Sequence, residues 1–222
     1  MRQKKVILAS QSPRRQEMLG WVMPQYTAQP ANLDEEMRAD ETPAEYVQRL
    51  ALSKAQAVHF ATWGQSGVLG ADTIVLLDGE VLGKPKTRSE VLKMLSALRG
   101  REHQVLTAIA WLPAGGDEAF TDLCVSHVPM RDYTRQEMLD YIHTGDPYDK
   151  AGGYAIQNEP FHPVENFSGC FASVMGLPLC HLKRTLARAG VILEVNLPKI
   201  CQNHLNYTCF ISERVLRGEL AG

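Results

Sequence analysis

The segment Val68–Leu77 constrains the fold of this chain more than any other, because it is strongly apolar and ends at a turn signal. All but two of its residues are aliphatic or glycine, and several are β-branched, which predicts a strand in the core of a sheet. Asp78-Gly79 follows directly and is a strong signal for a β-hairpin, with Glu80–Leu82 as the returning strand. The chain is therefore expected to build a sheet that contains at least one hairpin.

Strand and helix patterns alternate along the rest of the chain. Residues suited to cap a helix N-terminus precede four amphipathic or apolar stretches, at Ser12, Thr42, Thr87 and Thr134. Further apolar runs predict strands at Val6–Ala9, Gln104–Leu112, Phe120–Val128 and Cys170–Met175, and a last helix is predicted at Pro178–Ala189. A long loop, from Asp146 to Gly169, separates the helix after Thr134 from the predicted strand at Cys170–Met175. Helices, strands and hairpins in this order predict a mixed sheet in an α/β or α+β architecture.

Length and charge limit the classes of function. A chain of 222 residues is long enough for one domain, or one domain of two lobes, without disulfides. Lysine and arginine number 23 against 25 aspartate and glutamate residues, a formal net charge of −2. A broad surface for nucleic acid or anionic membrane is therefore not expected, and any cationic ligand site must be local.

The apolar segments and cysteines bear on the compartment. Val6–Ala9 is shorter than the roughly 7–15 residues of a secretory core, and no run approaches the roughly 18 apolar residues of a membrane span. Five cysteines are an odd number, which favours a reducing compartment, with Cys124 and Cys170 as buried thiols. We expect a protein of the cytoplasm.

Several charged residues occupy positions where a charge does not favour the stability of the fold. Arg14 and Arg15 follow Ser12-Pro13 at a predicted helix N-terminus, whose partial positive charge suits an anion better than a cation. Lys54 lies on the apolar stripe of the helix after Thr42. Each has two interpretations: a phosphate site or a solvated first turn for the arginines, and a cleft ammonium or a snorkelling side chain for Lys54.

Asp72 interrupts the strongest predicted strand. A carboxylate in a strand core costs several kcal/mol unless it is paired, hydrogen-bonded or bound to a metal. We favour a functional role over a structural hydrogen bond. The small residues Gly70 and Ala71 just before it are expected to leave room for a ligand to approach the backbone.

Two further segments add cations. Gly83-Lys84-Pro85 is expected to form a rigid turn that fixes the direction of the Lys84 ammonium. The loop from Lys150 to Gln157 is rich in glycine, and the Gln157 side chain at its end can both donate and accept hydrogen bonds. One buried acid with several cations is a set suited to bind polyphosphate with a divalent ion.

Six ordered motifs resemble the Maf family of nucleoside triphosphate pyrophosphatases, over about residues 5 to 192. The motifs are Leu8–Arg15, Tyr46–Ala55, Leu69–Val75, Leu82–Pro85, Asp149–Gln157 and Gly176–Pro178. The resemblance implies an α/β fold with a mixed, curved central sheet and flanking helices, whose two lobes enclose a nucleotide. It also implies cleavage of a nucleoside triphosphate between the α and β phosphates, with a divalent metal, Mg²⁺ or Mn²⁺.

The resemblance assigns roles residue by residue. Asp72 matches the catalytic aspartate, a proton acceptor that also touches the metal, and Glu35 matches the acidic residue on the metal side. The polar and cationic phosphate positions are matched by Ser10, Arg15, Lys54 and Lys84, and the cation Lys150 of the late loop is added to the substrate-binding set.

Base selection in the family is carried by positions matched here by Arg14, Thr73 and Gln157. This combination is similar to the branch acting on dTTP and UTP, whereas the branch preferring 7-methyl-GTP typically has tryptophan at the position of Arg14. Thr87 departs from the family, which often has an acidic residue there. Residues 1–192 are expected to form the Maf-like domain, residues 193–222 an extension, and the resemblance implies a homodimer.

Alternatives stay open at this point. A nucleotide-binding regulator of cell division needs the cations but has no use for Asp72, and a relative of the inosine triphosphate pyrophosphatases predicts purine preference. In the extension, Cys201, His204 and Cys209, with Cys180-His181 upstream, are either zinc ligands or part of a plain helical segment.

Overall fold

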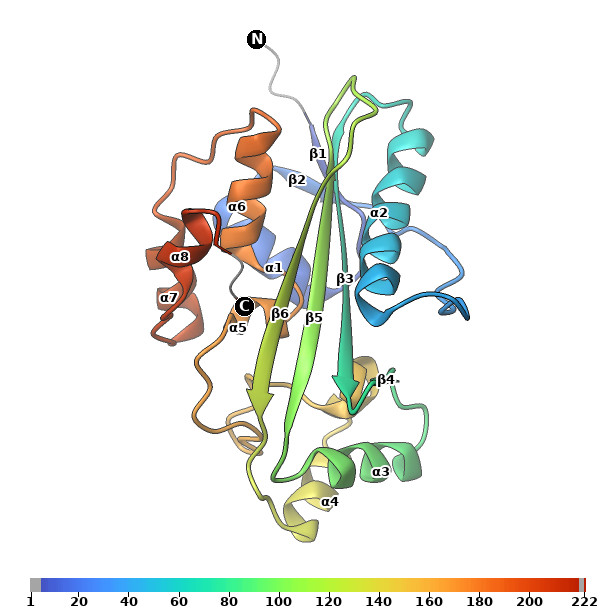
Figure 1. Ribbon diagram of the computed structural model, residues 1–222, viewed down its shortest axis with the longest axis vertical. Coiled ribbons are helices and arrows are strands. Elements are labelled where there is room, and N and C mark those ends of the chain that lie inside the picture. Colours follow the sequence, from blue (N-terminus) through green and yellow to red (C-terminus); the bar gives the residue numbers. More distant parts are fainter. Residues whose placement is uncertain (1–4, 220–221) are drawn as a thin grey trace.

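The computed structural model describes residues 5–219 and 222 (Figure 1). In the first half of the chain the elements are β1 (Val6–Leu8), α1 (Pro13–Val22), β2 (Tyr26–Ala28), α2 (Pro43–Ala61), β3 (Gly67–Leu77), β4 (Glu80–Leu82) and α3 (Arg88–Leu98). In the second half they are β5 (Glu102–Leu112), β6 (Phe120–Pro129), α4 (Arg135–His143), the 3₁₀ turns η1 (Asp146–Asp149) and η2 (Ala151–Gly153), α5 (Phe171–Val174), α6 (Leu179–Arg188), α7 (Leu197–Leu205) and α8 (Ser212–Leu216).

The strands form one mixed sheet in the order β2-β1-β3-β5-β6, with β4 paired to β3. β1 pairs parallel with β2 and β3, while β3, β5 and β6 form antiparallel pairs. β3 and β4 form the hairpin predicted at Asp78-Gly79. The predicted α/β class with a mixed sheet and flanking helices is confirmed.

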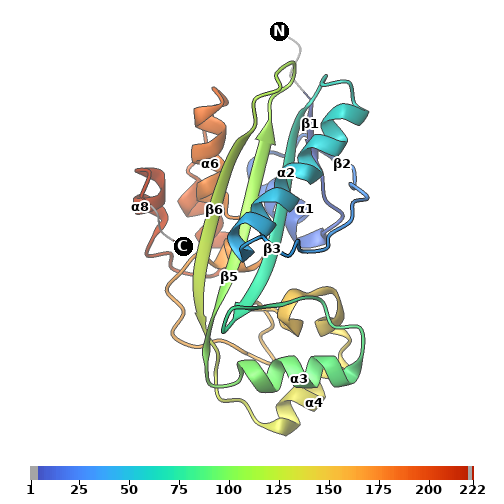
Figure 2. The ribbon, with the colours of Figure 1, turned by 45° about the vertical axis from the view of Figure 1, so that its right-hand side comes forward.

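Helices cover both faces of the sheet. α2 packs on β3 and β5, and its buried stripe shares an apolar cluster with Val68, Ile74 and Leu106 (Figure 2). The opposite face is covered by α1, α5 and α6, and α7 and α8 pack on the outside of this layer (Figure 1). A separate apolar cluster joins α3 and α4 to the far ends of β3, β5 and β6. The long strands therefore connect two lobes with distinct cores.

A gap in the sheet pairing exposes one edge of β3. β1 pairs with β3 only as far as Leu69, and β4 pairs with it only from Val75 onward. Among the described strands, none pairs with Gly70–Ile74 on this side, although β5 pairs along the other. Asp72 stands in the middle of the gap. Successive side chains of a strand point to opposite faces of the sheet. The unpaired stretch of β3 therefore carries side chains of both faces.

Two expectations from the sequence need correction, and one strand was not predicted. Cys170–Met175 does not form a strand: Cys170 is the N-cap of the short helix α5, since a brief apolar run does not distinguish a buried strand from a buried helix. Gly70 does not make room for a ligand. A Cβ atom there would lie 2.1 Å from the carbonyl oxygen of Ala51, so this glycine is required for the close approach of α2 to β3. The strand β2 was not predicted, because Tyr26–Ala28 is too short to show a periodic pattern.

The helix starts were predicted more accurately. Thr42 and Thr134 form complete capping boxes with Glu45 and Glu137. At Thr87 the side chain accepts the expected hydrogen bond, but the Glu90 carboxylate accepts from the backbone N–H of Lys86 rather than closing the box.

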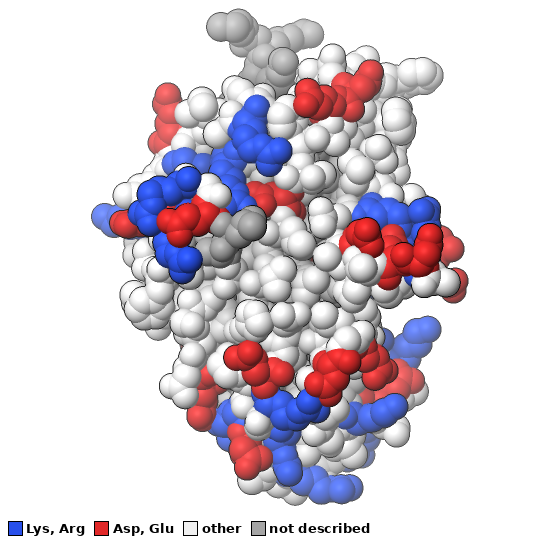
Figure 3. Space-filling model, viewed as in Figure 1, with Lys and Arg blue, Asp and Glu red and all other residues white. Residues whose placement is uncertain are grey.

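The surface and the extension complete the fold. On the face drawn in Figure 3, lysine and arginine side chains lie among aspartates and glutamates, as the near-zero net charge suggests. Within residues 5–219, no helix combines the length and the apolar character that a bilayer crossing requires. α7 and α8 are the helices that the helical interpretation of the extension predicted.

Candidate active site

A cavity of about 720 Å³ opens at the gap in the sheet and is lined by both lobes. Its wall includes the loop after β1, the first turn of α1, the edge of β3, the late loop after η1 and the segment after α5. All predicted site residues except Asp72 line it: Ser10, Arg14, Arg15, Glu35, Lys54, Thr73, Lys84, Lys150 and Gln157. The topology thus brings together residues that are more than a hundred positions apart.

Asp72 is joined to the cavity through Lys54. The Lys54 ammonium lies 2.6 Å from Asp72 Oδ1 and 2.6 Å from Glu35 Oε1, so one nitrogen holds two carboxylates. Lys54 and Asp72 are 8% and 7% exposed, whereas the Glu35 side chain is 52% exposed. The alternative that Lys54 snorkels to solvent is therefore wrong, and Asp72 satisfies the rule that a buried charge is paired.

The loop that carries Glu35 is tied to α2. The Tyr46 hydroxyl donates to the Glu35 carbonyl oxygen, and Arg49 donates to the carbonyl oxygen of Glu36 and pairs with Glu41. Burial raises the pKa of Tyr46, and the negative charges of Asp72 and Glu35 raise it further, so the phenol keeps its proton as a donor. These bonds hold the exposed carboxylate of Glu35 toward Lys54.

Arg15 fixes the other wall of the cavity. Its Nε donates to the carbonyl oxygen of Gly176 at 2.8 Å, Nη2 donates to Thr73 Oγ1 at 2.9 Å, and Nη1 lies 3.4 Å from Ser10 Oγ. Burial lowers the pKa of Arg15, the Asp72 charge opposes that shift, and the side chain stays cationic because guanidinium does not lose its proton in proteins. The interpretation of Arg15 as a solvated first-turn residue is wrong.

Thr73 links Arg15 to the segment that follows α5. The Thr107 hydroxyl lies 3.0 Å from Thr73 Oγ1 and donates to the carbonyl oxygen of Ser173 at 2.8 Å. The segment from Ser173 to Gly176 is thus held from two sides, by Thr107 and by Arg15. Any ligand atom near Thr73 meets a fixed polar wall.

The first turn of α1 presents an N-terminus suited to an anion. Ser12 caps the helix through its side chain, and no acidic residue lies in the first turn. Ser10 is buried and accepts from the backbone N–H of Ser12 at 3.2 Å. Helix N–H groups and two guanidiniums therefore face the same space, as a phosphate site requires.

Lys150 was predicted to bind substrate, but its contacts in the structure lie within the late loop. The ammonium donates to the Asp146 carbonyl oxygen, to Asp146 Oδ1 and to Asp149 Oδ1, which uses all three of its N–H bonds. Asp149 Oδ2 also pairs with Arg14 at 3.4 Å. Lys150 therefore holds the loop in shape rather than offering a free ammonium.

Lys84 and Gln157 contrast with Lys150. Both side chains line the cavity from exposed positions, and among residues 5–219 no carboxylate lies within ion-pair distance of Lys84. They are free to contact a ligand.

Sequence reasoning missed several residues of this wall. Tyr154 lines the cavity and its hydroxyl lies 2.8 Å from His103 Nε2, whose pKa burial lowers to about 4. Asp146 and Asp149 anchor Lys150, and Gly176 anchors Arg15 through its carbonyl oxygen. A backbone acceptor has no side-chain signature, so Gly176 could not be identified from residue type.

The carboxylates of Glu35 and Asp72 fit a divalent cation. Both direct an oxygen at one positive centre, and carboxylate oxygens are the ligands that Mg²⁺ and Mn²⁺ prefer. Mg²⁺ is typically held by one or two carboxylates together with substrate phosphates, which matches this donor set.

Comparisons with known proteins agree with the motifs. A family model described as Maf-like protein matches residues 5–189. A dTTP/UTP pyrophosphatase of Citrifermentans bemidjiense is 41% identical over 192 residues, covering 86% of this chain and 99% of that protein. A dTTP/UTP pyrophosphatase of Alkalilimnicola ehrlichii is 44% identical over 179 residues, covering 78% of this chain and 87% of that protein.

Solved structures give a weaker likeness. The Staphylococcus aureus Ham1 protein aligns with 58% of this chain and 73% of its own chain, at 17% identity and a TM-score of 0.41. That similarity is too low to bear on the function of this chain.

Proposed function

This chain belongs to the Maf family, and on that premise we propose that it hydrolyses dTTP, UTP and modified pyrimidine nucleoside triphosphates to monophosphate and pyrophosphate. The observation that carries the proposal is the gap in the sheet, where several cations line a cavity of about 720 Å³ and one of them, Lys54, pairs with the buried carboxylate of Asp72. That volume lies within the roughly 300–1,000 Å³ typical of small-molecule sites.

In the proposed reaction, Asp72 acts as the general base. It takes a proton from a water molecule whose oxygen attacks the α phosphorus, and the bond from that phosphorus to the α–β bridging oxygen breaks. The products are the nucleoside monophosphate and pyrophosphate. Proton transfer to a positioned base contributes about 10²–10⁴-fold to a rate.

The cations bind and orient the triphosphate. Arg15 and the N-terminus of α1 offer N–H donors to phosphate oxygens, and the exposed Lys84 adds a positive charge from the opposite lobe. Lys54 compensates the charge of Glu35 and Asp72. A divalent cation held by these two carboxylates would neutralise negative charge on the phosphates.

Base selection is proposed for Arg14, Thr73 and Gln157. Gln157 offers both a donor and an acceptor from an exposed position of the late loop, as a side chain that reads a pyrimidine edge requires. Lys150 contributes indirectly, by fixing that loop through Asp146 and Asp149. The homodimer and the cytoplasmic location stay predictions.

The test is a substrate panel with pyrophosphate release as the readout. Purified protein is assayed with dTTP, UTP, 5-methyl-UTP, dITP and 7-methyl-GTP, with Mg²⁺ or Mn²⁺ and with a chelator. Preference for the first three, lost with the chelator, is the expected result. Preference for dITP or 7-methyl-GTP contradicts the pyrimidine assignment, and nucleotide binding without turnover of any triphosphate favours the regulator.

A further inference from the structure

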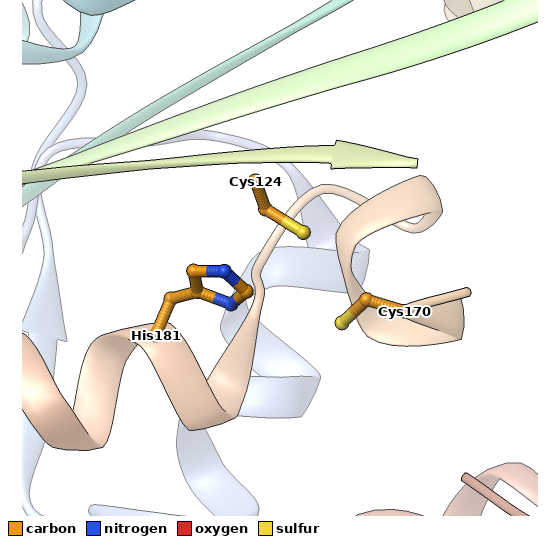
Figure 4. A group of neighbouring side chains, drawn as sticks. All are labelled: Cys124, Cys170 and His181. Carbon is orange, nitrogen blue, oxygen red and sulfur yellow. The ribbon is translucent and has the colours of Figure 1, made fainter. Parts of the chain in front are cut away.

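A buried cluster of soft ligand atoms lies apart from the carboxylates of the cavity. Cys124 on β6, Cys170 at the N-cap of α5 and His181 on α6 point toward one another (Figure 4). Their two sulfur atoms and one imidazole nitrogen all lie within 4.8 Å of one another. The three elements meet in the apolar layer on the Thr73 side of the sheet.

The imidazole of His181 has no hydrogen-bond partner for either ring nitrogen among the described residues, and the side chain is 1% exposed. Leaving a buried polar group without a partner costs about 1–3 kcal/mol, so native structures rarely do it. Ser173 Oγ, on the same short helix as the Cys170 cap, is likewise buried without a partner. A metal ion that accepts the imidazole lone pair removes the cost at one of the two ring nitrogens of His181.

We propose that Cys124, Cys170 and His181 bind a zinc ion. Ligand atoms around tetrahedral zinc lie about 3.5–3.8 Å apart, given bonds of about 2.3 Å to sulfur and about 2.0 Å to nitrogen. The observed spacing within 4.8 Å therefore requires shifts of only about 1 Å.

Charge and donor type favour zinc over monovalent copper and over magnesium or calcium. Two thiolates and a neutral imidazole around Zn²⁺ form a site of zero net charge, whereas a monovalent copper ion would leave one buried negative charge. Magnesium and calcium are excluded by the donors, because they take oxygen ligands.

Among the described residues the cluster offers three ligand atoms, so a fourth ligand would come from outside it. A small cavity of about 10 Å³ borders Cys170, but neither Cys124 nor His181, and is lined further by Cys180, Cys201 and Cys209. The extension therefore packs beside the proposed site. His204, considered above as a zinc ligand, instead stacks on Trp21 with ring centroids 4.4 Å apart.

The zinc would act as a structural clamp behind the active site. Cys170 begins α5, and the same segment continues to Ser173 and Gly176, whose carbonyl oxygens hold Thr107 and Arg15. Fixing Cys170 to β6 and α6 therefore fixes the wall that positions Arg15.

The test measures metal content rather than activity. Protein purified under reducing conditions without added chelator is expected to contain about one zinc per chain by elemental analysis. After removal of zinc, titration with Co²⁺ is expected to give the thiolate charge-transfer and tetrahedral d–d absorption bands, with saturation at one equivalent. Magnesium gives neither signal, so failure of the proposed hydrolysis would leave this result unaffected.

Matched variants identify the ligands. Cys124→Ser, Cys170→Ser and His181→Asn should each lose zinc, while Cys180→Ser and Cys201→Ser, buried or half-buried thiols beside the site, should retain it. Circular dichroism checks that each variant is folded, and the Co²⁺ spectrum of the unmodified chain stands even where a variant does not fold. Three results would overturn the proposal: no stoichiometric zinc or cobalt, a Cys124–Cys170 disulfide by mass, or zinc lost from Cys201→Ser but kept in His181→Asn.

Discussion

Asp72 and Thr73 are neighbours in β3, yet they serve opposite faces of the sheet. On the Asp72 face, two carboxylates converge on the single ammonium of Lys54. On the Thr73 face, the guanidinium of Arg15 is held by neutral oxygens from Thr73, Ser10 and Gly176. The first face carries groups that can move a proton or hold a cation, and the second carries groups that orient an anion.

In the proposed reaction, the gap between β1 and β4 would let the two faces act on one ligand. In a fully paired strand, neighbouring residues are separated by the sheet itself. Here the edge of β3 is open from Gly70 to Ile74, so both side chains border the same opening. In the proposed reaction, this two-residue stretch would supply both the base and a group that binds the nucleotide.

The largest expected effect comes from removing the acid of the Asp72 face. Asp72→Asn keeps the shape but removes the base, so kcat for pyrophosphate release should fall by about 10²–10⁴-fold. Nucleotide affinity, measured by calorimetry, should change little, because the Thr73 face is intact. Asp78→Asn is the control, since that carboxylate lies on the same hairpin but pairs with Arg101 at the surface. Equal losses in both variants would contradict the assignment of the base.

The next effect is on stability. Lys54→Met leaves the carboxylate of Asp72 buried without its partner, and breaking a buried pair in this way costs about 3–5 kcal/mol in the free energy of unfolding. Denaturant titration measures this loss. The double variant Lys54→Met/Asp72→Asn should recover most of it, because no uncompensated charge remains.

Lys84→Met is the control for that comparison. Lys84 is exposed, and surface substitutions of this kind usually change stability by less than about 0.5 kcal/mol. A double variant no more stable than Lys54→Met alone would show that the Lys54–Asp72 pair is not the source of the loss.

The Lys54–Asp72 pair shows which part of the site could be predicted from the sequence. Asp72 in an apolar strand and Lys54 on an apolar stripe were recognisable as misplaced charges, because burying each alone is costly. The sequence did not predict that they compensate each other, since pairing depends on the approach of α2 to β3. Gly70 records that approach, and its role was misread as space for a ligand.

The Thr73 face was harder to predict. The arginines after Ser12-Pro13 were a visible signal, but the partners of Arg15 are the carbonyl oxygen of Gly176 and the hydroxyl of Thr73, which lie 161 and 58 positions further along the chain. The mixed class of the sheet followed from the alternating patterns. The strand gap did not, because β1 and β4 are each only three residues long and their lengths define it.

A smaller effect should follow from changing the cation of the Thr73 face. Arg15→Lys keeps the charge but loses the planar set of donors that reaches Gly176 and Thr73 together, so KM should rise by about 10–100-fold with a smaller change in kcat. Arg99→Lys is the matched control, because Arg99 pairs with the exposed Asp132 and does not line the cavity. A fall in kcat without a change in KM would place Arg15 on the chemical side of the comparison.

The smallest expected effect tests the hydroxyl of Thr73 itself. Thr73→Val preserves the shape but removes the acceptor for Arg15, and one hydrogen bond is worth about 0.5–1.5 kcal/mol, or roughly 2–12-fold in kcat/KM. Thr73→Ser retains the hydroxyl and should stay near the unmodified activity. If Thr73 also contacts the base, the loss in the valine variant will differ between dTTP and dITP in the same pyrophosphate assay. An equal loss for both nucleotides would confine Thr73 to holding Arg15, so that base selection would fall to Arg14 and Gln157.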